Sequence, residues 1–209
     1  MRIETKEIKI YKFKELSEDV KENVKENFDS LIQNIKFDWL KEDLLEYLKS
    51  KHNIKGCKLE YSFSYCQGDG CCFYDIKLLN YERLKHKKDM NSFECFIVEK
   101  YSSEEIELIL EYLNDDCNLQ LIKQSSHYSH KCTCSIDYEW YYNDDKEFEK
   151  KINNLIDKLA QDLETNVFYV ICDEMEEIGY NCYNVDEDEI LDYIESNNIE
   201  FLEDGLIFR

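Results

Sequence analysis

Apolar residues recur at helical spacing over the first quarter of the chain. Between residues 20 and 35 they fall three or four positions apart, shortly after Ser17, a residue type that often caps the start of a helix. A second run with helical spacing covers residues 39–48, and Gly56 gives a stop signal beyond it. The pattern predicts a short strand at 8–13 followed by two successive helices.

Apolar and polar residues alternate in the next segment, which reads "LEYSFSY" over residues 59–65. Apolar residues resume at 72–78 after the tetrapeptide "QGDG" at 67–70, whose glycines suit the positive backbone dihedrals of a tight turn. A phosphate-binding loop would require a helix after the glycines, whereas a strand is predicted there. A β-hairpin is therefore the favoured interpretation, and a ligand-binding loop is the alternative.

The middle of the chain continues to alternate helices with hairpins. A basic connector is predicted at 81–96, and Ser102 with Glu105 forms a capping box before a helix at 104–115. The segment 117–142 predicts a second hairpin, because alternation places five residues on one face of its outgoing strand. Those residues are Cys132, Cys134, Ile136, Tyr138 and Trp140.

The remaining segments complete the expected fold. Residues 143–179 show helical spacing with an interruption at 165–167, and a short helix follows at 187–198. Asp204 and Gly205 indicate a terminal hairpin. The sequence thus predicts an α+β fold, in which two hairpins build an antiparallel sheet covered by helices and a short C-terminal hairpin is added.

Charge is distributed unequally along the chain. Residues 1–101 hold 19 basic and 19 acidic residues, whereas residues 102–209 hold 7 and 28, which is the whole net charge of −21. One domain over 1–209 is favoured, and a neutral lobe followed by an acidic lobe is the alternative. An acidic field repels nucleic acid and attracts basic protein surfaces, although acidic composition also keeps proteins soluble. The predicted partner-binding residues are the two densest clusters, Asp173, Glu174, Glu176, Glu177, Asp186, Glu187, Asp188 and Glu189.

Ten cysteines raise the question of a disulfide framework or a metal site. Neither a signal peptide nor an apolar run of about 18 residues is recognisable, so free thiols in the cytoplasm are expected. No Cys-x-x-Cys pair occurs, and core packing is the favoured role of the cysteines. A zinc site is the alternative, and its candidate ligands are Cys66, Cys71, Cys72, His127, His130, Cys132 and Cys134.

Motifs of enzymatic chemistry are missing from the sequence, which shows no nucleotide-binding or nucleophile motif. Asp173 and Glu177 would share a helix face, but no histidine joins them at metal-ligand spacing. We therefore predict no catalytic residue, no metal and no other cofactor. A metal-dependent hydrolase is the alternative, with His127 and His130 as its first candidates.

Four segments form a recognisable combination that spans most of the chain: "ELSEDVKENV", "LEYSFSYCQGDGCCF", "HYSHKCTCSIDYE" and "IEFLEDG". Together they resemble a family of small phage and mobile-element proteins, some of which are described as antitoxin-like. The cysteines after "QGDG" depart from the family pattern, in which small polar residues or valine are expected. The resemblance implies a role in conflict between a mobile element and its bacterial host, in the cytoplasm of that host.

Charge and resemblance together favour a non-enzymatic, anti-CRISPR-like inhibitor that binds a bacterial defence nuclease. Its acidic face would occupy the basic groove that normally holds nucleic acid. The expected partner is a basic host protein that binds nucleic acid, and no direct contact with nucleic acid or a membrane is expected. An antitoxin that neutralises a toxin is the alternative under the same resemblance.

Overall fold

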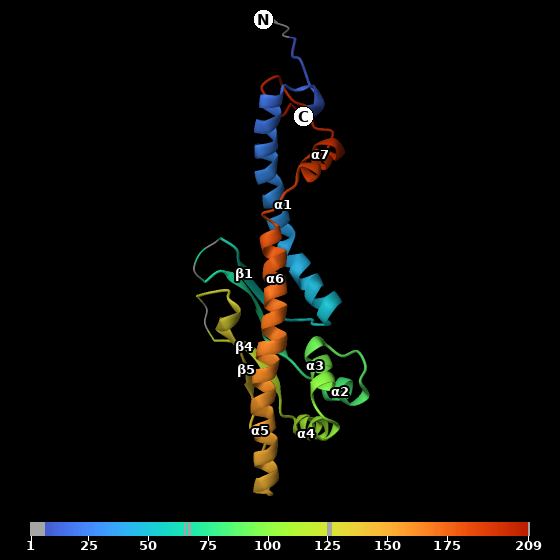
Figure 1. The fold of residues 1–209 in the computed structure, drawn as a ribbon, viewed down its shortest axis with the longest axis vertical. Helices are drawn as coiled ribbons and strands as arrows, with labels where there is room; N and C mark the ends of the chain where they lie inside the picture. Colours follow the sequence, from blue (N-terminus) through green and yellow to red (C-terminus); the bar gives the residue numbers. More distant parts are fainter. Residues whose placement is uncertain (1–6, 65, 67, 125–126, 209) are drawn as a thin grey trace, which may run out of the picture. The chain divides into compact units, whose positions relative to one another are not determined.

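The fold is α+β, as the sequence predicts, with two small antiparallel sheets among helices (Figure 1). The computed structural model describes residues 7–64, 66, 68–124 and 127–208.

The chain divides into two compact units. Unit 1 comprises residues 1–40 and 181–209, so that it combines both ends of the chain, and unit 2 comprises residues 41–180. These boundaries do not coincide with a division near residue 101. The single-domain interpretation stays a prediction.

Helix α1 (Glu18–His52) begins directly after Ser17 and contributes to both units. The prediction of two successive helices is wrong here, because the helix continues without a break between them. No glycine or proline occurs between residues 18 and 52 to interrupt its hydrogen bonds. It stops where Asn53 takes a left-handed conformation with φ of 51°, three residues before the predicted stop at Gly56.

The core of unit 1 packs the first part of α1 against α7 (Glu187–Ser196) and the short 3-10 helix η1 (Phe13–Glu15). Tyr11 and Ile207 each form an antiparallel bridge with Phe201, which supports the predicted C-terminal hairpin. The N-terminal strand predicted at 8–13 is reduced to the single bridge at Tyr11. The buried core residues are Phe13, Leu16, Val24, Phe28, Ile32, Ile190, Ile194 and Phe201.

The strands lie in unit 2 and form two sheets instead of the single sheet expected. Strands β1 (Lys58–Ser62) and β2 (Gly70–Tyr74) pair in an antiparallel hairpin, and a second sheet has the order β3-β4-β5. These strands cover Ile76–Lys77, Leu119–Lys123 and Cys134–Tyr138.

The first predicted hairpin is present, but its connection is longer than the four predicted turn residues. Ser62 pairs with Gly70, so the connection covers 63–69, and Tyr65 and Gln67 lie outside the described residues. Asp69 supports it, because its carboxylate accepts hydrogen bonds from the Ser62 hydroxyl at 2.6 Å and from a backbone N–H at 2.7 Å.

The segment predicted as a basic connector is instead helical. Helices α2 (Tyr81–His86) and α3 (Ser92–Lys100) are capped by Asn80 and Asn91, whose side chains accept backbone N–H bonds. Helix α4 (Ser103–Asn114) follows and has the predicted capping box of Ser102 and Glu105.

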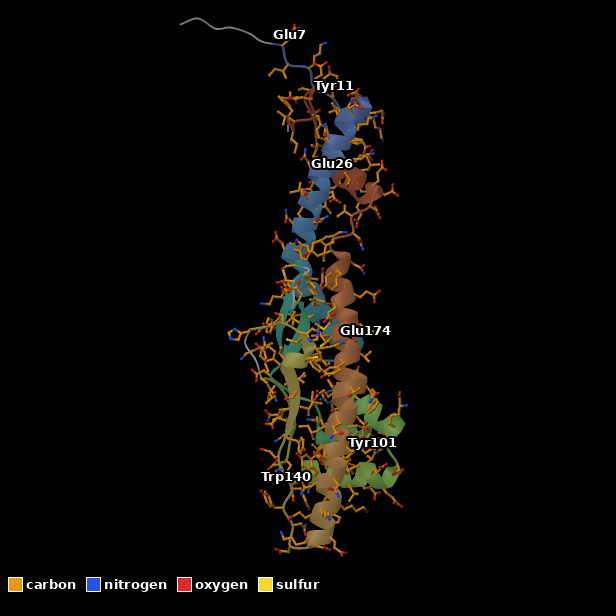
Figure 2. The ribbon with its side chains drawn as sticks, turned by 60° about the vertical axis from the view of Figure 1, so that its left-hand side comes forward. Glu7, Tyr11, Glu26, Tyr101, Trp140 and Glu174 are labelled. Atoms are coloured by element: carbon orange, nitrogen blue, oxygen red, sulfur yellow. The ribbon has the colours of Figure 1, made fainter. Side chains whose placement is uncertain are left out.

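The long C-terminal helical stretch is interrupted where predicted. Helix α5 (Lys146–Leu163) passes through a π-helical turn, η3 (Glu164–Phe168), into α6 (Tyr169–Asn181). In unit 2 the strands lie on one side of α5 and helices α2 to α4 on the other (Figures 1 and 2). The π turn inserts one residue into the helical period. Phe168 is buried within this turn, whereas Val170, which follows Val167 at helical spacing, is 48% exposed.

Candidate functional site

Glu174, in the first predicted acidic cluster, is engaged inside unit 2. Its carboxylate accepts hydrogen bonds from the Tyr47 hydroxyl at 2.6 Å and from the Lys51 ammonium at 2.8 Å. The Nε2 atom of buried His52 lies 3.4 Å from the same carboxylate, and its Nδ1 atom is 2.9 Å from the Ser92 hydroxyl. Burial lowers the pKa of His52, which keeps the imidazole neutral at pH 7. Glu174 thus joins α6 to α1 inside the unit.

The other residues of this cluster differ in their contacts. Asp173 pairs with Lys131, and Glu176 accepts the backbone N–H of Cys71 at 3.3 Å. Gly70 makes room for that carboxylate, since a Cβ atom there would lie 2.8 Å from Glu176 Oε1, and its φ is 149°. The last glycine of "QGDG" therefore has a packing role in addition to its place in the hairpin.

The second predicted cluster stabilises the start of α7 in unit 1. Asp186 caps the helix by accepting the backbone N–H of Glu189 at 2.8 Å. Glu187 and Glu189 form ion pairs of 2.8 Å with Lys25 and Lys36 of α1. Like most of the first cluster, these carboxylates already have partners within their own unit.

Glu177 and Asp188 are the two members of the predicted set whose side chains make no hydrogen bond or ion pair with the residues described. The two clusters also belong to different units. Unit 1 holds 9 basic and 18 acidic residues, and unit 2 holds 17 and 29, giving net charges of −9 and −12. The neutral and acidic halves of the sequence therefore do not correspond to a neutral and an acidic unit.

A site that the sequence analysis missed lies where the chain leaves β5. Tyr141 is buried, and Asn153 of α5 holds its backbone on both sides. The Tyr141 N–H donates to Asn153 Oδ1 at 3.0 Å, and Asn153 Nδ2 donates to the Tyr141 carbonyl at 2.9 Å. The neighbouring side chains of Trp140 and Tyr142 are 57% and 78% exposed. An anchored backbone thus displays two large aromatic groups to solvent.

The expected alternation fails at both ends of this strand. Cys134 and Ile136 are buried as predicted, but Cys132 and Trp140 are exposed. Strand β5 ends at Tyr138, so the period of two no longer applies beyond it. The signal that the sequence offers for this site is the run of three aromatic residues at 140–142, directly after the strand end.

Carboxylates surround the two aromatic groups. Residues 137–149 contain six acidic residues and one lysine, Lys146, which pairs with Glu149 at 2.8 Å. Asp145 caps α5. Within the described part of the chain Asp137, Asp144 and Glu147 are exposed and have no ion pair. We call six exposed residues of this stretch the aromatic–acidic surface; they are Asp137, Glu139, Trp140, Tyr142, Asp144 and Glu147.

Neighbouring contacts hold this surface in place. The Tyr138 hydroxyl donates to Asp157 of α5, and this bond raises the pKa of Tyr138 to about 12. Glu139 accepts the backbone N–H of Asn118 at 3.1 Å, and its carbonyl accepts the Tyr112 hydroxyl at 2.9 Å. Figure 2 labels Trp140 on the strand side of α5. The surface therefore rests on both β5 and α5.

The candidate zinc ligands are distributed between core and surface. Cys71, Cys72 and Cys134 are buried, whereas Cys66 and Cys132 are exposed. The hydrogen bond to Cys72 and burial raise the pKa of the Cys134 thiol. Three or more His, Cys, Asp or Glu side chains do not come together in a metal-binding arrangement among the described residues.

Of the other two candidates, His130 caps the short helix η2 (Lys131–Thr133), and its Nδ1 atom accepts the Cys132 N–H at 3.1 Å. His127 is exposed. His130 thus has a local structural role.

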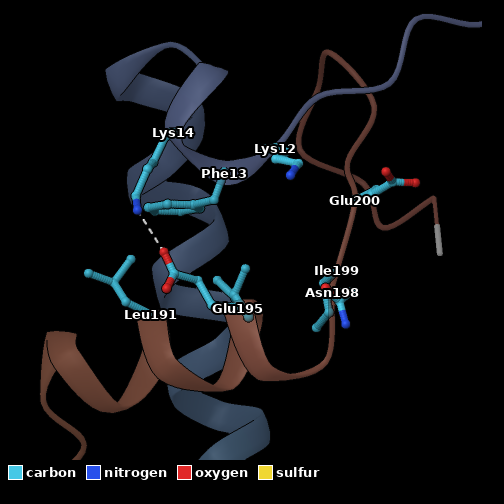
Figure 3. Close-up of a pocket in the computed structure, with 9 residues that line it drawn as sticks. Lys12, Phe13, Lys14, Leu191, Glu195, Asn198, Ile199 and Glu200 are labelled. Carbon is cyan, nitrogen blue, oxygen red and sulfur yellow. Dashed lines mark hydrogen bonds and ion pairs between the residues drawn. The ribbon is translucent and has the colours of Figure 1, made fainter.

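A hollow of about 330 Å³ lies in unit 1 (Figure 3). Its lining includes Phe13 and Ile194 of the core, and Lys14 donates to Glu195 at 2.7 Å beside the Phe13 ring. These two charged groups pair with each other, and Lys12 and Glu200 also line the hollow.

Comparison with protein-family models, with curated proteins and with solved structures finds no match to the chain. Across the described residues, every helix is too short or too polar to cross a lipid bilayer. The choice of the aromatic–acidic surface as the candidate site therefore rests on its geometry alone.

Proposed function

We propose that the protein is a non-enzymatic inhibitor that binds a basic, nucleic-acid-binding protein. The resemblance to phage and mobile-element proteins suggests that this partner is a bacterial defence nuclease, in the cytoplasm of the host. The observation that carries the proposal is the pair of displayed aromatic side chains, Trp140 and Tyr142, among carboxylates that have no cation partner.

The chemistry of single-stranded nucleic acid supports this assignment. Proteins hold such strands in positively charged grooves, where aromatic side chains and arginine stack on the bases. Exposed carboxylates can take the place of phosphates, and the rings of Trp140 and Tyr142 can take the place of bases. A groove built for nucleic acid would therefore bind the aromatic–acidic surface.

The anchoring of the surface supports high affinity. Tryptophan and tyrosine are enriched among the residues that contribute most to protein interfaces. Because Tyr141 and Asn153 already hold the backbone between the two exposed rings, little conformational entropy is lost on binding. The free carboxylates act mainly on the rate of association with a basic partner.

The proposal is tested by capture from a lysate of the bacterial host, identification by mass spectrometry, and titration with the purified partner. We expect the captured partner to be a protein that binds nucleic acid. An excess of single-stranded oligonucleotide should displace this partner from the inhibitor. The double variant Trp140→Ala, Tyr142→Ala should weaken the affinity about tenfold or more. Neutralising Asp137, Asp144 and Glu147 to their amides should slow association at low salt.

The control is the variant Glu177→Gln, Asp188→Asn, which removes two exposed charges from the predicted clusters and should bind like the parent. If this control weakens binding and the aromatic variant does not, the original clusters are the interface. If the partner is a toxin that oligonucleotide does not displace, the antitoxin alternative replaces the proposal.

A further inference from the structure

A second exposed surface lies in unit 1, where the two ends of the described chain come together. Phe201 bridges to Tyr11 on one side and to Ile207 on the other, so that three short segments pair through single bridges; we call this arrangement the ladder. Five of the eleven exposed large apolar side chains among the described residues belong to its outer segments, at 8–10 and 206–208. They are Ile8, Ile10, Leu206, Ile207 and Phe208, which are 42 to 62% exposed.

The ladder leaves an open edge at Ile207. Leu202 N–H donates to the Leu206 carbonyl at 2.8 Å, and Phe208 N–H donates to the Glu200 carbonyl at 2.7 Å. In an antiparallel pair, these bonds on either side of Ile207 direct its own N–H and C=O to the other side. Neither group has a hydrogen-bond partner within the described part of the chain. An extended segment could therefore pair there.

Acidic side chains accompany the apolar residues. Glu7, Glu203 and Asp204 line a shallow hollow of about 540 Å³ together with Lys9 and Leu202. Three carboxylates thus face one ammonium group, in a unit whose net charge is −9. Figure 2 labels Glu7 and Tyr11 at this end of unit 1. The charge favours a basic occupant and disfavours a second copy of this acidic chain.

We propose that this ladder is a docking surface for an extended segment of a partner protein in which lysine or arginine alternates with apolar residues. The segment adds as a strand at the edge of Ile207, its backbone bonding the free N–H and C=O. Its apolar side chains lie on the same face as Ile207, and its basic side chains lie near Glu203 and Asp204. This surface belongs to unit 1 and does not depend on the aromatic–acidic surface of unit 2.

Fluorescence anisotropy with labelled synthetic peptides tests the proposal on the full chain. The probes are short peptides of alternating leucine and lysine, serine and lysine, or leucine and glutamate. We expect the leucine–lysine peptide to bind about tenfold more tightly than the serine–lysine peptide, because it also buries apolar surface. The leucine–glutamate peptide should not bind. N-methylation of alternate amides, which removes strand pairing, should abolish the leucine–lysine preference.

The variant Ile207→Ser, Phe208→Ser should reduce the leucine–lysine preference to within about twofold. Trp39→Ser, which changes another exposed apolar residue of unit 1, should retain the preference, and thermal melting checks that both variants fold. Unchanged preference in the double variant would overturn the proposal. If the leucine–glutamate peptide binds as tightly as the leucine–lysine peptide, the proposal of a basic partner is wrong. It is also wrong if the parent chain forms dimers in sedimentation and the double variant does not.

Discussion

The two predicted acidic clusters and the aromatic–acidic surface have opposite roles in the structure. The carboxylates of Glu174 and Glu189 contact lysines and tyrosines that lie far away in the sequence, and they hold helices together. Asp144 and Glu147 also lie in an acidic stretch, but they have no ion pair in the described chain. Density of acidic residues therefore does not identify an interaction face. What matters is whether the fold brings cations or backbone N–H groups to them.

The largest effect on stability is expected at Glu94, the carboxylate with the most hydrogen-bond donors around it. Glu94 is completely buried and accepts hydrogen bonds from Arg83 at 3.0 Å and from the backbone N–H groups of Asn80 and Asn91 at 2.8 and 2.9 Å. Glu94→Ala should lower the free energy of unfolding by about 3 kcal/mol, because these donors lose their acceptor. Urea denaturation measures the change. A loss no larger than that of an exposed acid would show that the engaged carboxylates contribute no stability.

A matched pair on α6 sharpens the comparison. Glu174 contacts Tyr47 and Lys51, whereas Glu177, three residues later, is exposed and without a partner among described residues. Glu174→Ala should cost about 1 to 2 kcal/mol, a range reduced for its partial exposure. Glu177→Ala should stay within about 0.5 kcal/mol of the parent. Equal losses in the two variants, measured by chemical denaturation, would contradict the distinction.

The same cluster predicts how stability depends on pH. Burial lowers the pKa of His52 below its ordinary value of 6.5, although Glu174 opposes this and Lys51 adds to it. The unfolded chain then binds the proton more tightly, so this stability is present above about pH 6.5 and is lost as the pH falls. For Glu174 burial is outweighed by bonds from Lys51 and Tyr47, so its pKa is lowered and a further loss of stability follows as the pH falls below its ordinary value of 4.5.

The variant His52→Gln should flatten the decrease in stability between about pH 7 and pH 5, because it removes the titrating group. Thermal melting at a series of pH values measures this. The control is Trp39→Ser at an exposed position of α1, which removes no titrating group and should leave the slope unchanged. A slope that persists in the His52 variant would assign the effect to other groups.

Features that depend on neighbouring residues were predictable from the sequence, whereas contacts between distant segments were not. Local signals were sufficient for the capping box of Ser102 and Glu105, for both hairpins of unit 2 and for the interruption of the long helix. The capping box of Asn91 and Glu94 follows a lysine-rich segment, whose composition favoured the prediction of a connector. The exposure of Trp140 was not predictable, because it depends on the hydrogen bonds between Asn153 and the backbone of the buried Tyr141. The partners of Glu174 were hidden for a similar reason, since they come from α1.

The smallest expected effect concerns acidic residues on α4. Exposed Glu104, Glu107 and Glu111 follow one another at helical spacing, and no basic residue occupies the last turn. Glu111→Lys should stabilise the protein by about 0.5 kcal/mol, because it places a cation near the helix C-terminus and four residues after Glu107. Glu104→Lys should instead destabilise slightly, since acidic residues are favourable near a helix N-terminus. If the melting temperature rises in Glu111→Lys and falls in Glu104→Lys, a carboxylate without a partner can reduce stability, in contrast to Glu174. Equal shifts for both variants would mean that only the net charge of the chain matters.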